Sequence, residues 1–334
     1  MKIIITGATG LLGGWLVSDL LQDSVDLTII RYKKRLNYED SEKNPRNYCQ
    51  YLLRDFDKQC KEKFIDLTDY ESVEKIIRET QPDAIIHMAA VSRVHIAKKN
   101  PKHTYELASN GTLNILEAIR LHSPSTVFIC HTDHKFYSGN KLPFNEDMLF
   151  NPNFIFDAAK ISKEYLTKIY SKTYQVKGVT IRSGSYFGGY DFNLHRIIPY
   201  VIKCLINNEK VELRTNGNLT RDFLYIKDAV LINRMLINEM SEPNSSFEFG
   251  NAFNFSLENT NSIMEIIEKI SEIYGKKPEI DFIGGGHPLY ESSELPNIKL
   301  DCTKAKLKLN WKPKYSLDKG LEETIDFYRS YFSQ

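Results

Sequence analysis

The chain has 334 residues, of which 42% are hydrophobic and 26% charged, and its formal net charge at pH 7 is +1. Such a length and composition are typical of a globular protein with one large or two modest domains. A charge this close to zero provides no strong field for a nucleic acid or a membrane surface, so we expect neither as a partner.

The five cysteines are scattered without the spacing of a metal site. They indicate free thiols in a reducing compartment, and no metal site is expected. No apolar run approaches the roughly 20 residues of a membrane-spanning helix. The first strand begins at once, without a signal peptide. We therefore expect a cytoplasmic enzyme.

The stretch IIITGATGLLGG, residues 3–14, is a short apolar run that enters a glycine-rich turn, and apolar residues then recur at helical spacing. Glycines three apart allow the tight turn, let the backbone approach a diphosphate and permit close packing of helix on strand. The N–H groups that open the helix then face the phosphates. The stretch predicts a dinucleotide site, with an ordinary strand–helix turn as the alternative. Its residues are Gly7, Thr9, Gly10, Leu11, Leu12 and Gly13.

The second predicted strand, residues 26–30, is followed by Arg31 and by further basic residues at 33–35. NAD-binding folds often have an acidic residue here, which holds the ribose 2′-hydroxyl. A cationic cluster suits a 2′-phosphate instead. We therefore expect NADP(H), with NAD(H) and a solvated basic loop as the alternatives.

Strands and helices alternate through residue 189, apart from the charged stretch 36–62, which predicts a long surface excursion. The stretch 63–67 predicts a strand, 81–90 a strand that enters a small-residue turn, 125–137 a strand that runs into a polar loop, and 178–189 a strand with a glycine-rich exit. The predicted helices are 70–79, Pro101–His122 and Ile155–Tyr174. This alternation predicts an α/β fold with a Rossmann-type, doubly wound parallel sheet.

Ligands of such a sheet lie at the carboxyl ends of its strands. Asp66 and Leu67 end one predicted strand and are expected near the adenine, and Ala89 and Ala90 end the next, beside the cofactor. The loop 132–137 ends a third strand, so its polar side chains are expected to meet a ligand.

Beyond residue 189 the regular alternation of predicted strands and helices changes. Predicted elements are a helix at 196–207, a strand at 210–215, a strand and helix start at 217–230, a return to the sheet at 248–250, and helices at 262–274 and 301–333. They predict a smaller α/β substrate domain interleaved with the first. The predicted dinucleotide-binding domain is 1–182 plus about 223–258, and the substrate domain is 183–222 and 259–334.

Stretches spread over essentially the whole chain resemble the extended short-chain dehydrogenase/reductases that modify nucleotide sugars. They are, in order, TGATGLLGGWL, QPDAIIHMAA, NGTLNILEAIR, the loop 132–137, RSGSYFGG, HRIIPYVI, TRDFLYIKDAV and LDCTKAKLKLNWKP. RSGSYFGGYDFNLHRIIP and KLDCTKAKLKLNWKP look like CDP-glucose 4,6-dehydratases. The basic loop after the second strand looks more like NADP-dependent GDP-mannose 4,6-dehydratases.

The resemblance implies a redox cycle at C4 of a nucleotide-diphosphate sugar. A tyrosine of a Y-x-x-x-K pair takes the C4 hydroxyl proton while hydride passes to the nicotinamide. The lysine lowers the pKa of the tyrosine and bonds the nicotinamide ribose. Lys160 matches this lysine, and Thr132 matches a hydroxyl residue that orients the C4 oxygen. In the dehydratases, an acid and a base then remove water across C5 and C6.

This sequence departs from the family at the tyrosine position, where Phe156 has no proton to exchange. Aligned through Tyr137, the loop has Asp133 in place of a hydroxyl residue, His134 at the acid position and Lys135 at the base position. An imidazole and a carboxylate are both groups that accept a C4 proton when close enough.

Three interpretations remain open. The first is a dehydratase-like reaction with a new base, and the second is a homologue that binds cofactor and sugar nucleotide with little turnover, or serves as a partner subunit. The third is 4-epimerisation or 4-ketoreduction. For His134 the alternative is an ordinary hydrogen-bonded loop histidine. For Phe156 it is an engineered exchange, although His134 in the same site favours natural divergence.

By resemblance, Arg196 and Arg221 lie near the nucleotide diphosphate, where a guanidinium fork suits phosphate oxygens. A surface salt bridge is the alternative for each. Ser185 stands where relatives often have asparagine, and residues 286–288 replace a further Arg-Pro of many relatives. The two long helices form the four-helix bundle of a dimer in relatives, so we expect a homodimer, although apolar stripes also suit a monomer core.

Overall fold

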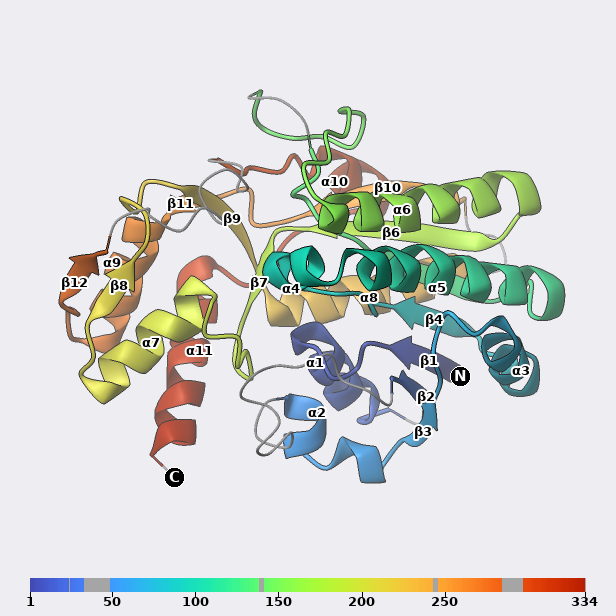
Figure 1. Cartoon of the computed structure of the whole chain (residues 1–334), viewed down its shortest axis with the longest axis horizontal. Helices are drawn as coiled ribbons and strands as arrows, with labels where there is room; N and C mark the ends of the chain where they lie inside the picture. The colour runs from blue at the N-terminus through green and yellow to red at the C-terminus, as the bar shows by residue number, and fades with distance from the viewer. Residues whose placement is uncertain (24, 33–48, 138–140, 243–245, 284–296, 334) are drawn as a thin grey trace. The chain divides into compact units, whose positions relative to one another are not determined.

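The computed structural model describes residues 1–23, 25–32, 49–137, 141–242, 246–283 and 297–333 (Figure 1). The chain divides into two compact units. The first comprises Met1–Gly139, Leu149–Arg182 and Val230–Phe253, and the second Asn140–Met148, Ser183–Ala229 and Asn254–Gln334. The domain boundaries expected from the sequence stay a prediction.

A seven-stranded sheet in the order β10-β6-β5-β4-β1-β2-β3 forms the centre of the first unit. Its strands are β1 Lys2–Thr6, β2 Asp26–Arg31, β3 Lys61–Phe64, β4 Ala84–His87, β5 Val127–His131, β6 Lys177–Ser183 and β10 Ala252–Phe255. From β6 to β3 all neighbours pair in parallel. The strand order reverses between β1 and β4, which is where doubly wound sheets bind ligands. The predicted fold class is confirmed.

Helices cover both faces of this sheet. They are α1 Leu11–Leu20, α2 Gln50–Leu53, α3 Tyr70–Thr80, α4 Val94–Lys99, α5 Pro101–His122, α6 Ile155–Tyr174 and α8 Ile226–Ser241, with a 3-10 turn at Phe56–Lys58. Buried side chains of α3, α5 and α6 share one apolar core with those of the strands. On the other face, Arg234 of α8 pairs with Asp19 of α1.

The strongly patterned segments form where the sequence predicts them. β1, β4 and β5 are almost entirely buried, as expected of parallel strands covered on both faces. In α3, Val73, Ile76 and Ile77 form the buried stripe, and the side chain of Asp69 caps the helix by accepting a hydrogen bond from the N–H of Ser72. The helices α5 and α6 match their predicted bounds and run side by side (Figure 1).

The predicted surface excursion is wrong over residues 49–56. There the chain forms α2 and the 3-10 turn, and Tyr51 is fully buried. Gly14 makes this possible, because a Cβ atom on Gly14 would lie 2.8 Å from Cβ of Gln50. The following strand, β3, starts and ends earlier than predicted, since Lys61–Phe64 pairs with β2.

Two further boundaries differ from the prediction. In the stretch 178–189, β6 ends at Ser183, and the predicted glycine-rich exit contains a further strand, β7, Ser185–Phe187, in a separate sheet. A Cβ atom on Gly184 would lie 2.8 Å from the carbonyl oxygen of Asp222, so only glycine allows this close passage. The return to the large sheet is β10, Ala252–Phe255, rather than 248–250.

The second unit contains two small sheets. One has the order β11-β9-β7 and the other pairs β12 with β8. The remaining strands are β8 Val211–Leu213, β9 Thr220–Tyr225, β11 Thr260–Ser262 and β12 Ile280–Phe282, and the helices are α7 Ile197–Asn207, α9 Ile263–Tyr274, α10 Thr303–Leu309 and α11 Leu317–Phe332. A capping box starts α9, with Ser262 and Glu265 each accepting a hydrogen bond from the backbone N–H of the other.

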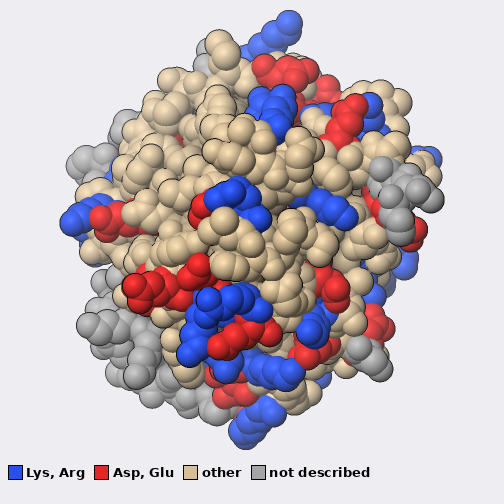
Figure 2. Space-filling model, turned by 90° about the vertical axis from the view of Figure 1, so that its right-hand side faces the viewer, with Lys and Arg blue, Asp and Glu red and all other residues tan. Residues whose placement is uncertain are grey.

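Acidic and basic side chains are interspersed on the face shown in Figure 2, in keeping with the near-zero net charge. Among the described residues, no helix is long and apolar enough to span a bilayer.

Candidate functional site

The glycine turn between β1 and α1 leaves no room for side chains. Gly7 has a left-handed backbone with φ of +84°, and a Cβ atom on Gly13 would lie 2.4 Å from the carbonyl oxygen of Gly7. Gly10 is the N-cap of α1, and the first turn of the helix carries no acidic side chain. The backbone at the helix start is thus open to an anion, and the turn fits the diphosphate of a dinucleotide.

The end of β4 packs directly on this turn. The N–H of Met88 donates to the carbonyl oxygen of Thr6 at 3.1 Å, and the N–H of Ala89 donates to Thr6 Oγ1, also at 3.1 Å. A Cβ atom on Gly7 would lie 2.9 Å from the backbone nitrogen of Ala89. The structure therefore brings Gly7 and Ala89 together, with Ala90 next along the chain.

Arg31, at the end of β2, is held by an acidic side chain. Its Nη1 lies 2.5 Å from Glu62 Oε1, and the hydroxyl of Tyr51 donates to the same oxygen at 2.8 Å. The Arg31 guanidinium also lies over the rings of Tyr51 and Phe64. Glu62 was not predicted as a site residue, because it falls within the predicted surface excursion. The basic residues 33–35 lie outside the described residues.

Asp66 and Leu67 follow β3 in a tight turn. Asp66 Oδ1 accepts hydrogen bonds from the N–H of Thr68 at 3.0 Å and from its hydroxyl at 2.8 Å. Leu67 is buried, and its carbonyl oxygen accepts a hydrogen bond of 2.8 Å from Asn114 of α5. Both residues sit at the carboxyl end of the strand, as the cofactor prediction requires.

The polar loop after β5 is ordered by its own backbone. Asp133 Oδ1 accepts hydrogen bonds from the N–H groups of His134 at 2.8 Å and Lys135 at 3.0 Å. His134 is buried, and its Nδ1 lies 3.6 Å from the same oxygen. Burial alone would raise the pKa of the Asp133 carboxyl, but the charges of His134, Lys135 and Lys160 outweigh it and lower the pKa. Thr132 donates its hydroxyl to the carbonyl oxygen of Ile181 at 3.2 Å.

Phe156 opens α6 inside an apolar cluster. Its ring is buried and packs with Val91 and Ala97. One turn later, Lys160 is also buried, and its Nζ lies 5.5 Å from the centre of the Phe156 ring. Burial lowers the pKa of Lys160, whereas the charge of Asp133 opposes that shift. The loop after β5 and the start of α6 therefore form one electrostatically coupled group.

Three predicted substrate residues lie in the second unit. Ser185 on β7 and Arg221 on β9 belong to neighbouring strands of one sheet. Arg221 donates from Nη1 to the carbonyl oxygen of Thr220 at 2.8 Å. Arg196 lies just before α7, and its Nη1 is 2.9 Å from Oδ2 of the buried Asp191. Residues 286–288 lie outside the described residues.

No group of three or more His, Cys, Asp or Glu side chains in the described part of the chain is arranged to hold a metal ion.

The parallel sheet, the glycine turn and the Lys160 helix define a class of protein, the NAD-dependent epimerases and dehydratases among the extended short-chain dehydrogenase/reductases. Within this class the chain belongs to the GDP-mannose 4,6 dehydratase family, whose model matches residues 4–324. A nicotinamide cofactor and a nucleotide-sugar ligand are characteristic of this family of enzymes. The predicted family relationship is confirmed.

Relatives of this chain include both dehydratases and epimerases. The dTDP-glucose 4,6-dehydratase of Haemophilus influenzae is 23% identical, with 98% of each chain covered. A putative UDP-glucose 4-epimerase of Methanocaldococcus jannaschii is 25% identical, also with 98% of each chain covered. The structure of UDP-glucuronic acid 4-epimerase from Bacillus cereus, in complex with UDP-glucuronic acid and NAD, has a TM-score of 0.83 at 22% identity and covers 99% of this chain and 100% of its own.

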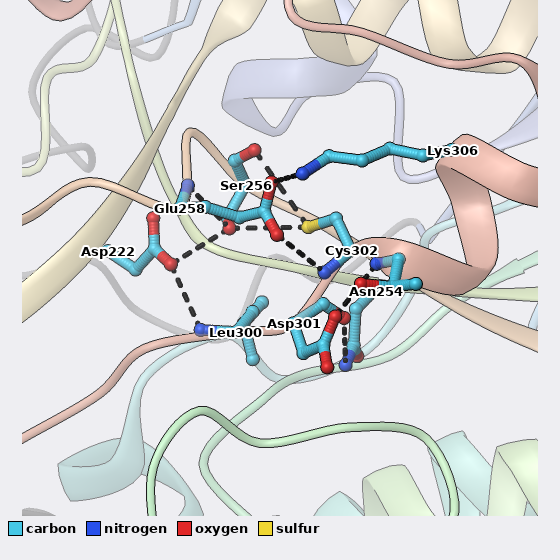
Figure 3. A network of polar contacts seen from close by, with 9 residues as sticks. Asp222, Asn254, Ser256, Glu258, Leu300, Asp301, Cys302 and Lys306 are labelled. Carbon is cyan, nitrogen blue, oxygen red and sulfur yellow. Dashed lines mark hydrogen bonds and ion pairs between the residues drawn. The ribbon is translucent and has the colours of Figure 1, made fainter.

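A buried polar network surrounds Asp222 in the second unit (Figure 3). Asp222, the next residue on β9, is fully buried, and its Oδ2 accepts hydrogen bonds from the hydroxyl of Ser256 at 2.8 Å and the N–H of Leu300 at 3.0 Å. Its Oδ1 has no hydrogen-bond partner among the described residues. Burial, reinforced by the charge of Glu258, raises the pKa of Asp222 from 3.8 to about 6.

The network continues from Ser256 to α10. The thiol of Cys302 lies 3.4 Å from the Ser256 hydroxyl, the N–H of Cys302 donates to Glu258 at 3.1 Å, and Glu258 pairs with Lys306 (Figure 3). Burial raises the pKa of the Cys302 thiol, so it stays protonated at neutral pH. Asp222 is therefore the member of the network whose charge changes just below neutrality.

Asp222 is expected to make folding of the second unit depend on pH. A carboxyl whose pKa is raised on folding stabilises the fold fully below its unfolded pKa, and this stabilisation is lost as pH rises through about 6. The loss amounts to about 2 kcal/mol between pH 4 and pH 7. In Asp222→Asn, the free energy of unfolding relative to wild type should increase over this range, as measured by urea denaturation. A constant difference would show that Asp222 keeps its ordinary pKa.

Proposed function

We propose that this chain oxidises C4 of a nucleotide-diphosphate sugar transiently, as 4,6-dehydratases do, with the Asp133–His134 pair in place of the usual tyrosine. One observation carries the proposal. At the carboxyl end of β5, Nδ1 of the His134 ring lies 3.6 Å from Oδ1 of the Asp133 carboxylate, while the side chain at the tyrosine position is a buried phenylalanine. The proton acceptor is then displaced from the helix to the loop.

The backbone prepares Asp133 for this role. Two N–H groups fix its Oδ1 and help to keep it ionised. An ionised carboxylate near Nδ1 favours the tautomer of His134 with the proton on that nitrogen. Nε2 is then the basic atom that takes the C4 proton.

Other chain residues complete the arrangement. When bound, the nicotinamide supplies the hydride acceptor for C4. The backbone of the glycine turn holds its diphosphate, and Lys160 bonds its ribose. Thr132 orients the C4 oxygen, and Lys135 serves as the base that removes the C5 proton in the dehydratase reaction. Arg196 and Arg221 bind the diphosphate of the sugar nucleotide.

Two other functions have support. The same oxidation at C4 serves a 4-epimerase or a 4-ketoreductase, and relatives of both the dehydratase and the epimerase kind resemble this chain over nearly its full length. A homologue that binds its ligands without turnover is supported by Phe156 itself, whose buried ring has no proton to exchange and packs with Val91 and Ala97.

The decisive experiment uses the full chain with cofactor and a panel of CDP-, GDP-, UDP- and dTDP-sugars. Mass and absorbance distinguish a 4-keto-6-deoxy product from an epimer or a reduced sugar. His134→Ala should lower kcat by about 10² to 10⁴ with sugar-nucleotide binding retained, because a general base is lost. His122→Ala, which removes a histidine paired with Glu74 at the end of α5, is the matched control.

The Phe156→Tyr variant distinguishes the hypothesis of an active enzyme from that of an inactive homologue. Activity that appears only in this variant identifies the native chain as a binding homologue without a competent base. Native turnover that His134→Ala leaves unchanged rules out the replacement base. Tight cofactor binding with no product from any sugar also favours the homologue.

Cofactor selectivity follows from Arg31 and Glu62 in this proposal. The Glu62 carboxylate neutralises the guanidinium and repels a 2′-phosphate, which favours NAD(H). The basic residues after β2 favour NADP(H), which stays the alternative.

Glu62→Gln should therefore raise the ratio of NADP to NAD affinity by about tenfold, or ~1.4 kcal/mol. Titration of both dinucleotides by calorimetry measures the ratio. Glu106→Gln, on the exposed Lys102–Glu106 pair of α5, is the control. If the wild type already binds NADP more tightly and Arg31→Ala abolishes the preference, NADP(H) is the cofactor.

A homodimer through α5 and α6 is the proposed assembly. Both helices leave large apolar side chains exposed: Tyr105, Leu113 and Leu121 on α5, and Tyr165, Ile169 and Tyr174 on α6. Burying these side chains against a second copy would stabilise the dimer.

Ile169→Lys should shift the molar mass in light scattering from dimer to monomer, since it inserts a charge into the apolar surface. Leu307→Lys on α10 replaces a side chain that is even more exposed and should leave the mass unchanged. A monomeric wild type would refute this assembly.

A further inference from the structure

A second lysine of α6 is buried more completely than Lys160. Lys163 lies three residues later on the same helix and is 0% exposed. Fully buried lysines are rare, because the ammonium group loses its hydration. In the described part of the chain, no carboxylate forms an ion pair with Lys163. Neither the C4 chemistry nor sugar binding uses this residue, so its charge needs another explanation.

The Nζ of Lys163 reaches the end of β4. It donates to the carbonyl oxygen of His87 at 3.5 Å and to that of Ala89 at 3.4 Å. These are long contacts, but they direct two carbonyl dipoles toward one ammonium group. Lys163 therefore binds the last residue of β4 and the turn that follows it, beside the proposed cofactor site.

The glycine turn binds these residues through their other polar groups. Thr6 accepts the N–H of Met88 with its carbonyl oxygen and the N–H of Ala89 with Oγ1, and Oγ1 also lies 2.8 Å from Nδ1 of His87. Gly7, the next residue, packs directly on Ala89. The end of β4 is thus held between Lys163 of α6 and the start of the glycine turn.

The ammonium group of Lys163 changes its charge near neutral pH, whereas the neighbouring histidines and Cys130 stay neutral there. Burial, reinforced by the charge of Lys160, lowers the pKa of Lys163 to about 7, and Cys130 of β5 opposes this shift. Burial keeps His87 of β4 and His131 of β5 neutral, lowering the pKa of His131 to about 3. Burial also raises the pKa of the Cys130 thiol.

We propose that Lys163 is a positioning residue for the dinucleotide, whose ammonium form holds the end of β4 in the geometry that lets the glycine turn accept the diphosphate. The inference rests on the proposed cofactor use and not on the sugar chemistry. Binding of the anionic dinucleotide then favours the protonated form of Lys163, so cofactor affinity and proton uptake are linked.

The sign of the linkage follows from the direction of the shift. Below pH 7 the lysine is already an ammonium group, and the dinucleotide binds without a proton. As pH rises through 7 the free chain loses this proton and must recover it on binding, so affinity falls.

Calorimetric titration of the full chain with NAD from pH 6 to pH 9, in buffers of different ionisation enthalpy, measures both effects. The wild type should take up as much as one proton near pH 8 and lose about tenfold in affinity between pH 6.5 and pH 8.5. Lys163→Met should remove the proton uptake and most of the pH dependence. At every pH it should bind NAD about as weakly as the wild type does at pH 8.5. Lys163→Arg keeps a permanent charge and should bind tightly without proton uptake.

Lys168→Met is the matched control, since Lys168 is an exposed lysine one turn further along α6. It should behave as the wild type. Proton uptake that persists in Lys163→Met would overturn the inference, as would its absence from the wild type, a result that does not depend on any variant folding. A chain that binds dinucleotides without a proton leaves the proposed function intact, whereas a chain that binds none refutes both.

Discussion

The buried guanidinium of Arg182 is the constraint on which the proposed site in the first unit depends. It lies on β6, forms an ion pair with Glu164 of α6 through two nitrogens, and donates to the hydroxyl of Tyr137 at 2.5 Å. Burial acts to lower the pKa of Arg182, but Glu164 and Tyr137 outweigh it, so the charge is retained. Because an uncompensated buried charge costs several kcal/mol, α6 and the loop after β5 cannot move independently of β6. Phe156 and Lys160 belong to that helix, and Asp133 and His134 to that loop.

Patterns within contiguous stretches of sequence were sufficient to predict the elements that interactions between nearby residues stabilise. The glycine turn and the long helices α5 and α6 were predictable, because turn chemistry and helical periodicity are properties of contiguous residues. The role of Glu62 was not predictable, because it is one carboxylate among many charged residues. Only the pairing of β2 with β3 brings it to Arg31. Lys163 was hidden for the same reason: its partners are carbonyl groups more than seventy residues earlier in the chain.

The exchange at position 156 agrees with its surroundings. A tyrosine needs a partner for its hydroxyl, and the cluster of Val91, Ala97 and Phe156 provides an apolar surface instead. In the proposed site the polar groups lie on the loop after β5, where the backbone N–H groups of His134 and Lys135 hold the Asp133 carboxylate. These mutually consistent features support the proposal that the site is reorganised as a whole.

The arginines proposed for phosphate recognition all have partners within the chain. Arg31 pairs with Glu62, Arg196 with Asp191, and Arg221 donates to a carbonyl oxygen. A phosphate must therefore exchange with a contact that already exists, which reduces the gain in free energy but keeps each guanidinium in a fixed orientation.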